Sequence, residues 1–510
     1  MKYMKYMKYL LGVALCSIGL SGCSNFEDIN TNPDSSTNVN SSLLATGAIA
    51  NIVKTSGTGK TFVSHQFISK YMGWGEGVMT GQYNDFGRTD FGDYSYLLDY
   101  KTMAEMAPAG YEESYKGLAL LLKSYILFNH TMEVGDIPYS EILKGEEGLL
   151  TPVYDTQKDV FLGILKDLDE AYENLSVAKN FEGDIVFSGS AQQWAKIATA
   201  LQLRVLIHLS KKESDTDLQV AKRFAEVYNR GNLMESNADN LQLVYSSKAG
   251  QLYPYHSSSN NHWSYAMLSD FLVDMLKENE DNRLFYFARP AQVKLDEGLD
   301  ESSWDAYVGV DPMAPISIVK ESYAKGTSCG LNDRYINYEP GEPFIRLGYA
   351  EQCFILAEAA LRGWIDADAN EFYKEGIRGS MKFISSNTPN EKLYHHGHPL
   401  TDEYVESFVS KESIQLSGNF NLDLEKIMKQ KYIASFMQMP YQPYYDYRRT
   451  GYPVFPINEE TSLNFNAPDK LPMRWQYPDV EISFNTENVE AAIKRQYGSD
   501  EVNKIMWILQ

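Results

Sequence analysis

Aromatic rings and short polar side chains occur together in two stretches of the sequence, a combination that suits sugar binding. A sugar ring has apolar C–H faces that stack on flat aromatic side chains, and hydroxyl rims that need polar partners. The first stretch, residues 71–100, contains six glycines, which favour loops. The second begins at Tyr253 and carries rings as far as Tyr338. Five rings with polar, glycine-rich or serine-rich neighbours are the predicted ligand contacts: Trp74, Tyr83, Trp263, Trp304 and Tyr307.

Each of these rings has an alternative place in the hydrophobic core, which is the more common position of large aromatic side chains. Replacing Trp263 or Trp304 by alanine would separate the two interpretations. A ligand contact would lose binding affinity with little change in thermal unfolding, whereas a core residue would lose stability.

Residue types that catalyse reactions are present without the spacing of known catalytic motifs. The 68 Asp and Glu residues single out no pair of the kind that glycoside hydrolases use. The sequence also lacks the nucleophile elbow, the zinc-protease helix, the phosphate loop and the dinucleotide-binding turn. We therefore expect no catalytic residues and no cofactor, with a lipid-anchored glycoside hydrolase as the enzymatic alternative.

Two segments contain residue types that bind metals. The segment His395-His396-Gly397-His398 could supply imidazoles to zinc, but no nearby carboxylate or thiolate completes a tetrahedral set, and Pro399 favours a surface loop. The segment 366–370 lacks the spacing of an EF-hand calcium loop, and we interpret Asp366 as a helix cap. No metal site is predicted.

The N-terminus has the features of a secretory signal. Three lysines precede an apolar run from Leu10 to Leu20, which is too short to span a bilayer. The run ends in Leu20-Ser21-Gly22-Cys23, which resembles the lipobox of bacterial lipoproteins and implies cleavage after residue 22. Cys23 then becomes the lipidated first residue, carrying acyl groups such as palmitate. The alternative is an ordinary signal peptide with a chance cysteine.

Charge and cysteine content narrow the classes of partner. Loss of residues 1–22 removes three lysines and takes the formal charge from −22 to −25, so no nucleic-acid partner is expected. Of the remaining cysteines, Cys329 and Cys353 could form a disulfide in an exported protein. Cys353 lies in an apolar helical pattern, which favours a buried free thiol instead.

Helical periodicity dominates the chain after a polar tether, residues 23–42. Residues 43–510 are predicted to form a single, mostly α-helical domain: a scaffold over about 43–231, a loop-rich region over about 232–349 and a C-terminal helical part over about 350–510. Paired helices in the scaffold resemble tetratricopeptide repeats. Helices are expected at residues 44–53, 111–132, 156–175, 191–211, 218–228, 265–278, 345–362, 367–385, 424–437, 488–497 and 501–508.

Six segments resemble the SusD/RagB family of outer-membrane nutrient-binding lipoproteins of Bacteroidetes, in particular its second SusD-like branch. Their order and number span nearly the whole mature chain. The segments are NFEDINTNP, GDIPYSEI, SAQQWAKIATALQLRVLIHLS, GYAEQCFILAEAALRG, YYDYRRTGYPVFP and RWQYPDVEISFNTENVEAAI.

The resemblance implies a tetratricopeptide-like scaffold with a loop-rich ligand-binding part, on the outer face of the outer membrane. Glu27 and Asp28 are similar to the signals that send such lipoproteins there. The family resemblance also implies that the protein captures a glycan, most often an oligosaccharide, and delivers it to a SusC-like TonB-dependent transporter without catalysing a reaction. Peptide capture is the alternative within the family.

The shared segments themselves are interpreted as architectural. Arg448 and Arg449 could bind an anion, but arginines beside tyrosines more often stack and pair within a fold. Asp136 and Pro138 are interpreted as turn residues.

Overall fold

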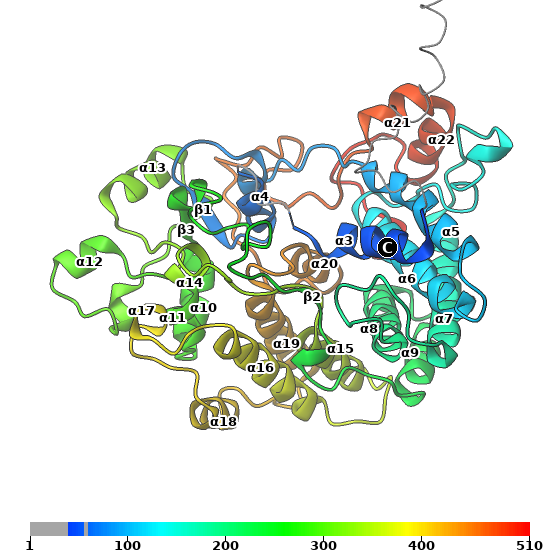
Figure 1. Ribbon diagram of the computed structural model, residues 1–510. Coiled ribbons are helices and arrows are strands. Elements are labelled where there is room, and N and C mark those ends of the chain that lie inside the picture. The colour runs from blue at the N-terminus through cyan, green and yellow to red at the C-terminus, as the bar shows by residue number, and fades with distance from the viewer. Residues whose placement is uncertain (1–38, 56–59) are drawn as a thin grey trace, which may run out of the picture.

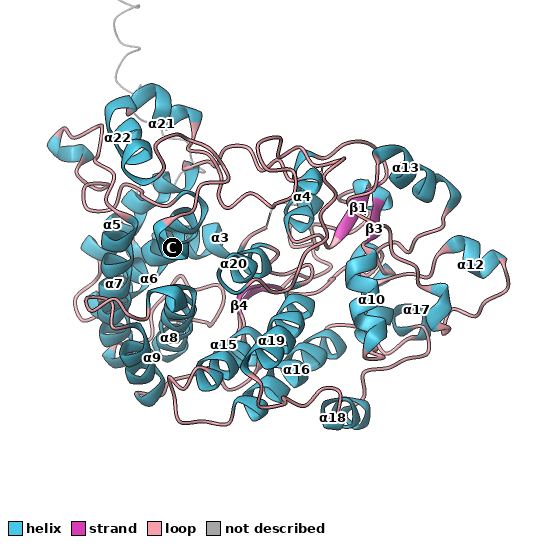
Figure 2. Ribbon diagram, turned by 180° about the vertical axis from the view of Figure 1, so that it is seen from behind, coloured by secondary structure: helices cyan, strands magenta, loops and turns pink. Residues whose placement is uncertain are grey.

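The computed structural model describes residues 39–55 and 60–510 (Figure 1). The predicted signal peptide, Cys23 and most of the predicted tether lie outside these residues. Within the described ranges, no helix is both long and apolar enough to cross a bilayer. Helices account for most of the ordered elements, and strands are few and short (Figure 2).

A stack of helices lies on the right of Figure 1. The long helices α6 and α7 pack side by side, and α7 and α8 form the next pair. Thr156 and Ser190 cap the starts of α7 and α8, because each hydroxyl accepts a hydrogen bond from the backbone N–H three residues later. This arrangement confirms the predicted helix pairs. The stack contains α3 (Ser41–Val53), α5 (Leu97–Glu105), α6 (Glu112–Val134), α7 (Gln157–Val177), α8 (Ala191–His208) and α9 (Val220–Asn229).

A second group of helices continues along the lower part of Figure 1. Its central member, α15, packs against α16, α19 and α8. The protein has a second hydrophobic core, formed by side chains of the second helix group and of the loop-rich part. Ile355 and Leu356 on α15 belong to the core of the helical stack, whereas Phe354 and Ala357 belong to this second core, so α15 joins the two. The group contains α15 (Tyr349–Leu361), α16 (Ala369–Ser386), α18 (Asp402–Ser410), α19 (Phe420–Ser435) and α20 (Tyr441–Thr450).

Short elements separated by loops make up a third part, which occupies the left side of Figure 1 and reaches its centre at β2. Two two-stranded antiparallel ladders hold it together, β1 with β3 and β2 with β4. These strands are β1 (Met72–Trp74), β2 (Leu241–Leu243), β3 (Ala266–Leu268) and β4 (Phe344–Leu347). The helices are α4 (Thr61–Ile68), α10 (Asp270–Glu278), α11 (Arg283–Phe287), α12 (Gln292–Asp296), α13 (Ile316–Lys325), α14 (Asp333–Ile336) and α17 (Lys392–His395).

The sequence did not predict the strands, because three or four residues show too little alternation to be recognised. Residues 265–268 and 345–347, which were expected to begin helices, instead lie in or beside strands, and α10 and α15 start only at Asp270 and Tyr349. The helix expected at residues 501–508 is also wrong. That segment is irregular and ends in one 3₁₀ turn, Trp507–Leu509, after α21 (Asp479–Phe484) and α22 (Thr486–Gln496).

Buried ion pairs connect the segments that carry the family resemblance. Arg204 on α8 donates from Nε to Glu351 on α15 over 2.8 Å, with both side chains buried. Arg449 on α20 pairs with Glu358 on α15 and with Asp446 one turn earlier, and Lys431 on α19 lies 2.9 Å from Asp446. Although burial raises the pKa of the Asp446 carboxyl, Lys431 and Arg449 hold it well below its ordinary value.

The neighbouring arginine, Arg448, donates to the backbone oxygens of Met473 and Met132 and stacks on Tyr444 and Tyr445. Both arginines are therefore used within the fold, which confirms the architectural interpretation of this segment.

The turn that follows α6 is held by Asp136, which also contacts the start of α7. Its Oδ1 accepts from the backbone N–H of Gln157 at 2.8 Å, and Oδ2 accepts from Arg495 on α22 at 2.9 Å. The sequence identified the turn but not these partners, which are distant in the chain.

The cap predicted at Asp366 is wrong by two residues: Asp368 caps α16, accepting from the N–H groups of Asn370 and Glu371. Cys329 and Cys353 are free and buried, as the apolar pattern around Cys353 indicates.

Candidate functional site

Three of the five predicted contact rings are in the protein interior. Trp74 and Tyr307 are 0% exposed and Tyr83 is 3% exposed. Tyr307 donates a hydrogen bond to the backbone oxygen of Glu301, and Tyr83 donates to that of Ala314. Sequence reasoning expected loops here, but Trp74 ends strand β1 and Tyr83 ends a 3₁₀ turn. The rings of Trp74 and Tyr307 belong to the second core. Their burial leaves them no open face for a ligand in this structure.

Trp304 is half-buried on the 3₁₀ turn Trp304–Ala306. Its ring meets Phe285 edge to face at 4.6 Å and lies 5.8 Å from the ring of His398. His398 in turn stacks flat on Phe285 and its Nε2 lies 2.8 Å from the backbone oxygen of Ser302. Trp304 is thus partly accessible, and its ring packs on those of Phe285 and His398.

The other histidines of this segment also have protein partners. His396 Nδ1 lies 2.9 Å from the carboxylate of Glu301, and burial lowers the pKa of His396 despite that carboxylate. Among the residues that the structure describes, no three His, Cys, Asp or Glu side chains form a group suited to a metal ion.

Trp263 lies on the 3₁₀ turn His262–Tyr265, just before β3. The guanidinium carbon of Arg289 is 5.2 Å from the centre of its indole ring, an arrangement that fixes the ring plane. The indole nitrogen is buried, so the accessible part of this half-buried side chain is apolar carbon. Trp263 is therefore partly accessible at the surface, while its ring also packs against the second core and under Arg289.

A shallow hollow of about 360 Å³ lies at the loop that precedes Trp263 in the chain. Its lining consists of hydroxyl, amide and imidazole side chains, the partners that sugar hydroxyls need. The lining residues are Ser257, Ser258, Ser259, Asn260, Asn261 and His262. His256 Nδ1 lies 2.7 Å from the Ser258 hydroxyl, and Asn260 accepts from the backbone N–H of His262, so the loop is internally bonded.

Two tyrosines near β3 contact each other, Tyr265 and Tyr323. Tyr265 lies 5.3 Å from Tyr323 on α13, which is 36% exposed, and 5.5 Å from the buried Trp74. Gly75 makes this packing possible, since a Cβ atom there would lie 2.5 Å from the Cβ and Cγ atoms of Tyr323. Together, the hollow and the rings of Trp263, Tyr265 and Tyr323 are called the Trp263 surface below.

Sequence reasoning missed Tyr265 and Tyr323. Tyr265 stood in the predicted helix 265–278, where a ring would be expected to face the core, and Tyr323 is on a short helix that the loop-rich texture concealed. The sequence signal for both is weak, because the contact between them joins residues 58 positions apart.

The loop beneath this surface is positioned by a buried lysine. Lys70 is 0% exposed and donates to the backbone oxygen of Gln82 at 2.6 Å and to Asn84 Oδ1 at 2.7 Å. Gln82 in turn accepts from the N–H of Trp74 and donates to the backbone oxygen of Pro312. Burial lowers the pKa of Lys70 to about 7. These contacts tie β1, which precedes Gly75, to the segment before α13.

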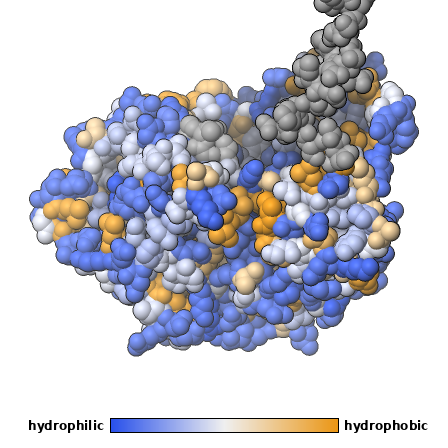
Figure 3. Space-filling model, in the orientation of Figure 1, coloured by the Kyte–Doolittle hydropathy of each residue, from blue (hydrophilic) through white to orange (hydrophobic). Residues whose placement is uncertain are grey.

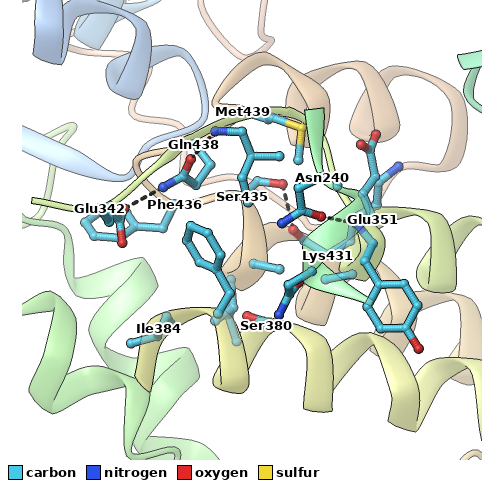
Figure 4. A pocket seen from close by; sticks show the side chains of 18 of the residues that line it. Asn240, Glu342, Glu351, Ser380, Ile384, Lys431, Ser435, Phe436, Gln438 and Met439 are labelled. Atoms are coloured by element: carbon cyan, nitrogen blue, oxygen red, sulfur yellow. Dashed lines mark hydrogen bonds between the residues drawn. The ribbon is translucent and has the colours of Figure 1, made fainter. Parts of the chain in front are cut away.

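An interior hollow near β4 has a different character (Figure 4). Its volume of about 30 Å³ holds little more than one water molecule. The polar groups drawn around it pair with one another: Gln438 bonds to Glu342 and to the backbone N–H of Ile345, and Asn240 accepts from that of Tyr349. We interpret this hollow as a packing defect in a bonded core.

The front face of the molecule is mostly hydrophilic, with small scattered apolar patches (Figure 3). Such a surface is compatible with a polar ligand held by a few aromatic rings.

Comparison with known proteins identifies relatives over nearly the whole chain. The family model SusD-like_2, described as "Starch-binding associating with outer membrane", matches residues 33–478. A SusD homolog from Bacteroides fragilis has 52% sequence identity, covering 92% of this chain and 100% of its own, with a TM-score of 0.90. The comparison with curated protein sequences found no match.

Two more solved structures are similar at lower identity. An outer membrane protein from Bacteroides vulgatus, described as involved in nutrient binding, has 31% identity over 92% of this chain and 100% of its own, with a TM-score of 0.83. A second SusD homolog from Bacteroides fragilis has 32% identity over 93% of this chain and 100% of its own, with a TM-score of 0.81.

Proposed function

This chain belongs to the SusD-like family of outer-membrane nutrient-binding proteins, and we propose that it captures an oligosaccharide at the cell surface and passes it to a SusC-like TonB-dependent transporter. The observation that carries the ligand class is the Trp263 surface, where a partly accessible indole ring directly follows a loop whose hollow is lined by hydroxyl, amide and imidazole groups. The transporter partner and the lipid anchor at Cys23 follow from the resemblance of the sequence to this family.

The Trp263 surface suits a sugar better than an apolar ligand. Its hollow is shallow, and its six lining side chains are all polar. A sugar ring would stack on the fixed indole face, while its hydroxyls would bond with the serine and asparagine side chains. Because such a contact involves stacking and hydrogen bonds only, the protein would release its ligand unchanged to the transporter, which suits a capture protein without catalysis.

Trp304 supports a second contact in the same proposal. Its ring lies above Phe285 and His398 and stays half-buried, so it could stack on another part of a longer chain. Trp263 and Trp304 are therefore the two originally predicted rings that we retain as ligand contacts.

Isothermal titration of the mature chain, residues 24–510, against polysaccharides, their oligosaccharides and mixed peptides tests this function. We expect saturable binding of a glycan with no product on long incubation. Binding of peptides alone would replace the glycan by a peptide ligand, and product formation would make the protein an enzyme.

The variants W263A and W304A locate the site. Removing a stacked ring should weaken binding of the titrated glycan about tenfold or more, with little change in thermal unfolding. W507A is the matched control, because Trp507 is also half-buried and lies under a cation, with Lys212 Nζ 4.7 Å from its ring centre. Equal affinity in W263A and W507A would refute the placement of the ligand at the Trp263 surface.

A further inference from the structure

One arginine differs from the others in the part of the chain that the structure describes. Arg289, which follows α11, has a guanidinium group with neither a hydrogen bond nor an ion pair to any described residue. Every other described arginine pairs with a carboxylate or donates to a backbone oxygen of the fold. The charge of Arg289 is therefore not used within the described fold.

Backbone pairing fixes the place of Arg289 in the loop-rich part. Its N–H donates to the backbone oxygen of Gly330 at 2.9 Å, and Gly330 in turn forms a bridge with Met267 on β3. Trp263 lies on the 3₁₀ turn that leads into β3. Arg289 and Trp263 are thus held by the same small set of paired segments, without a contribution from the charge of the arginine.

The guanidinium group is oriented by its neighbours but keeps access to solvent. It lies over the indole of Trp263, with 5.2 Å from its central carbon to the ring centre, within the range in which aromatic rings attract cations. Gly330 leaves room for it, since a Cβ atom there would lie 3.2 Å from Arg289 Nη2. Arg289 is half-buried, and none of its guanidinium nitrogens is a buried atom.

The chemistry of this group defines its partner. A guanidinium presents five N–H donors in a planar fork, accepts no hydrogen bond and stays charged at every physiological pH. A carboxylate matches it, because two oxygens in one plane accept two parallel N–H groups and neutralise the charge. A neutral hydroxyl would satisfy a single N–H and leave the charge without a partner.

The charges around Arg289 permit such a partner, although the protein as a whole is acidic. The net charge of −25 expected after signal cleavage repels anions at long range, but salt screens this repulsion over about 8 Å at physiological ionic strength. Glu76, next to Gly75 in the chain, is already paired with Lys60. The positive charge of Arg289 therefore stays available at short range.

We infer that the Trp263 surface takes an acidic oligosaccharide, and that Arg289 binds the carboxylate of a uronic acid unit. The inference rests on the proposed function, because it names the class of sugar for the same surface. The carboxylate would bond to the free edge of the guanidinium, while the hydroxyls of the sugar would bond to Ser258, Ser259 and Asn261, which are exposed in the hollow of the preceding loop.

Titration calorimetry of the mature chain with fragments of polygalacturonate, alginate and hyaluronan tests the inference. Each fragment is compared with the same fragment after reduction of its carboxylates to primary alcohols, which keeps the linkage and the length and removes only the charge. We expect at least one acidic fragment to bind at least tenfold more tightly than its reduced form. Equal affinity of the two forms, or no binding of any acidic fragment, would overturn the inference.

Variants of Arg289 locate the carboxylate. R289Q removes the charge and should weaken binding of the acidic fragment about tenfold or more, while any reduced fragment that binds should keep its affinity. R289K keeps the charge but loses the planar fork, so its affinity should lie between those of R289Q and the wild type. R223Q is the matched control, because Arg223 is a partly exposed arginine on α9 in the helical stack, and it should bind as the wild type does.

The outcomes separate this inference from the proposed function. Unchanged affinity in R289Q, or an equal loss for acidic and reduced fragments, would overturn the assignment of Arg289. Binding of neutral glycans alone would overturn the acidic ligand and leave glycan capture intact. Binding of peptides alone would refute glycan capture itself.

Discussion

Replacing Lys70 by methionine is expected to change how the stability of the protein depends on pH. Lys70 is fully buried, and its ammonium group donates hydrogen bonds to two neutral acceptors, the backbone oxygen of Gln82 and Asn84 Oδ1. Because burial disfavours the charged ammonium, its pKa falls from 10.5 to about 7 in the folded chain. Methionine has a similar length and no charge, and it keeps the backbone conformation at φ 54° no more strained than lysine does.

The sign and size of the effect follow from the two pKa values. Between about pH 7 and 10.5 the unfolded chain binds more protons at Lys70 than the folded chain, so the free energy of unfolding rises with pH in that window. One pKa unit corresponds to about 1.4 kcal/mol, so the free energy of unfolding should gain about 2 kcal/mol between pH 7 and pH 9. Below pH 7 both states are protonated, and the dependence on this group flattens.

Urea denaturation of the wild type and K70M, followed by tryptophan fluorescence at several pH values from 6 to 9, measures this effect. Buried tyrosines and cysteines also titrate at high pH, but they are common to both proteins and cancel in the difference between them. The wild type should gain about 2 kcal/mol relative to K70M from pH 7 to pH 9. A difference that stays constant over this range would show that Lys70 has the same pKa in both states and would refute the reasoning.

Three other changes test the buried ion pairs of Arg449, the contact between Tyr265 and Tyr323, and the lipid anchor at Cys23. R449M leaves the buried carboxylates of Glu358 and Asp446 short of a partner, so urea denaturation should show a loss of about 3–5 kcal/mol, and a loss below about 1 kcal/mol would contradict a structural role. G75A should displace Tyr323 and weaken glycan binding several-fold in calorimetry, whereas G77A, with nothing within 4 Å of its Cβ, is the matched control and should bind normally. C23A should move the protein from the membrane fraction to the soluble fraction, and unchanged membrane retention would contradict the lipid anchor.

The sequence predicts the long helices well, because their periodicity extends over many turns. The helices α6, α7 and α8 have apolar stripes long enough to be recognised, and two of them start at hydroxyl caps that are visible in the sequence. The errors fall on short elements. Residues 345–347 have the apolar composition of the helix that follows them, but pair as strand β4 with β2, a segment about 100 residues earlier. Long-range pairing of this kind leaves no local periodicity.

The candidate site was harder to predict because aromatic residues serve both the core and the surface. Trp74 and Trp263 have equally polar, flexible neighbours in sequence, yet Trp74 is fully buried in the second core, while Trp263 packs against that core under Arg289 and stays partly accessible. What separates them is the direction in which each loop turns, and this is set by the pairing of β1 with β3 and by contacts such as those of Lys70. These contacts join residues that are distant in the chain.

The same reasoning explains why the segments that reveal the family say little about the ligand. Arg204, Glu351, Glu358 and Arg449 come from three of these segments, and each pairs with a residue from another, so a change in one leaves a buried charge without its partner. This mutual dependence restricts substitution. Ser258, Ser259 and Asn261, by contrast, are exposed in the lining of an open hollow and can be exchanged with little cost to the core. A chain of this design can therefore keep its scaffold while its loops adapt to a different ligand.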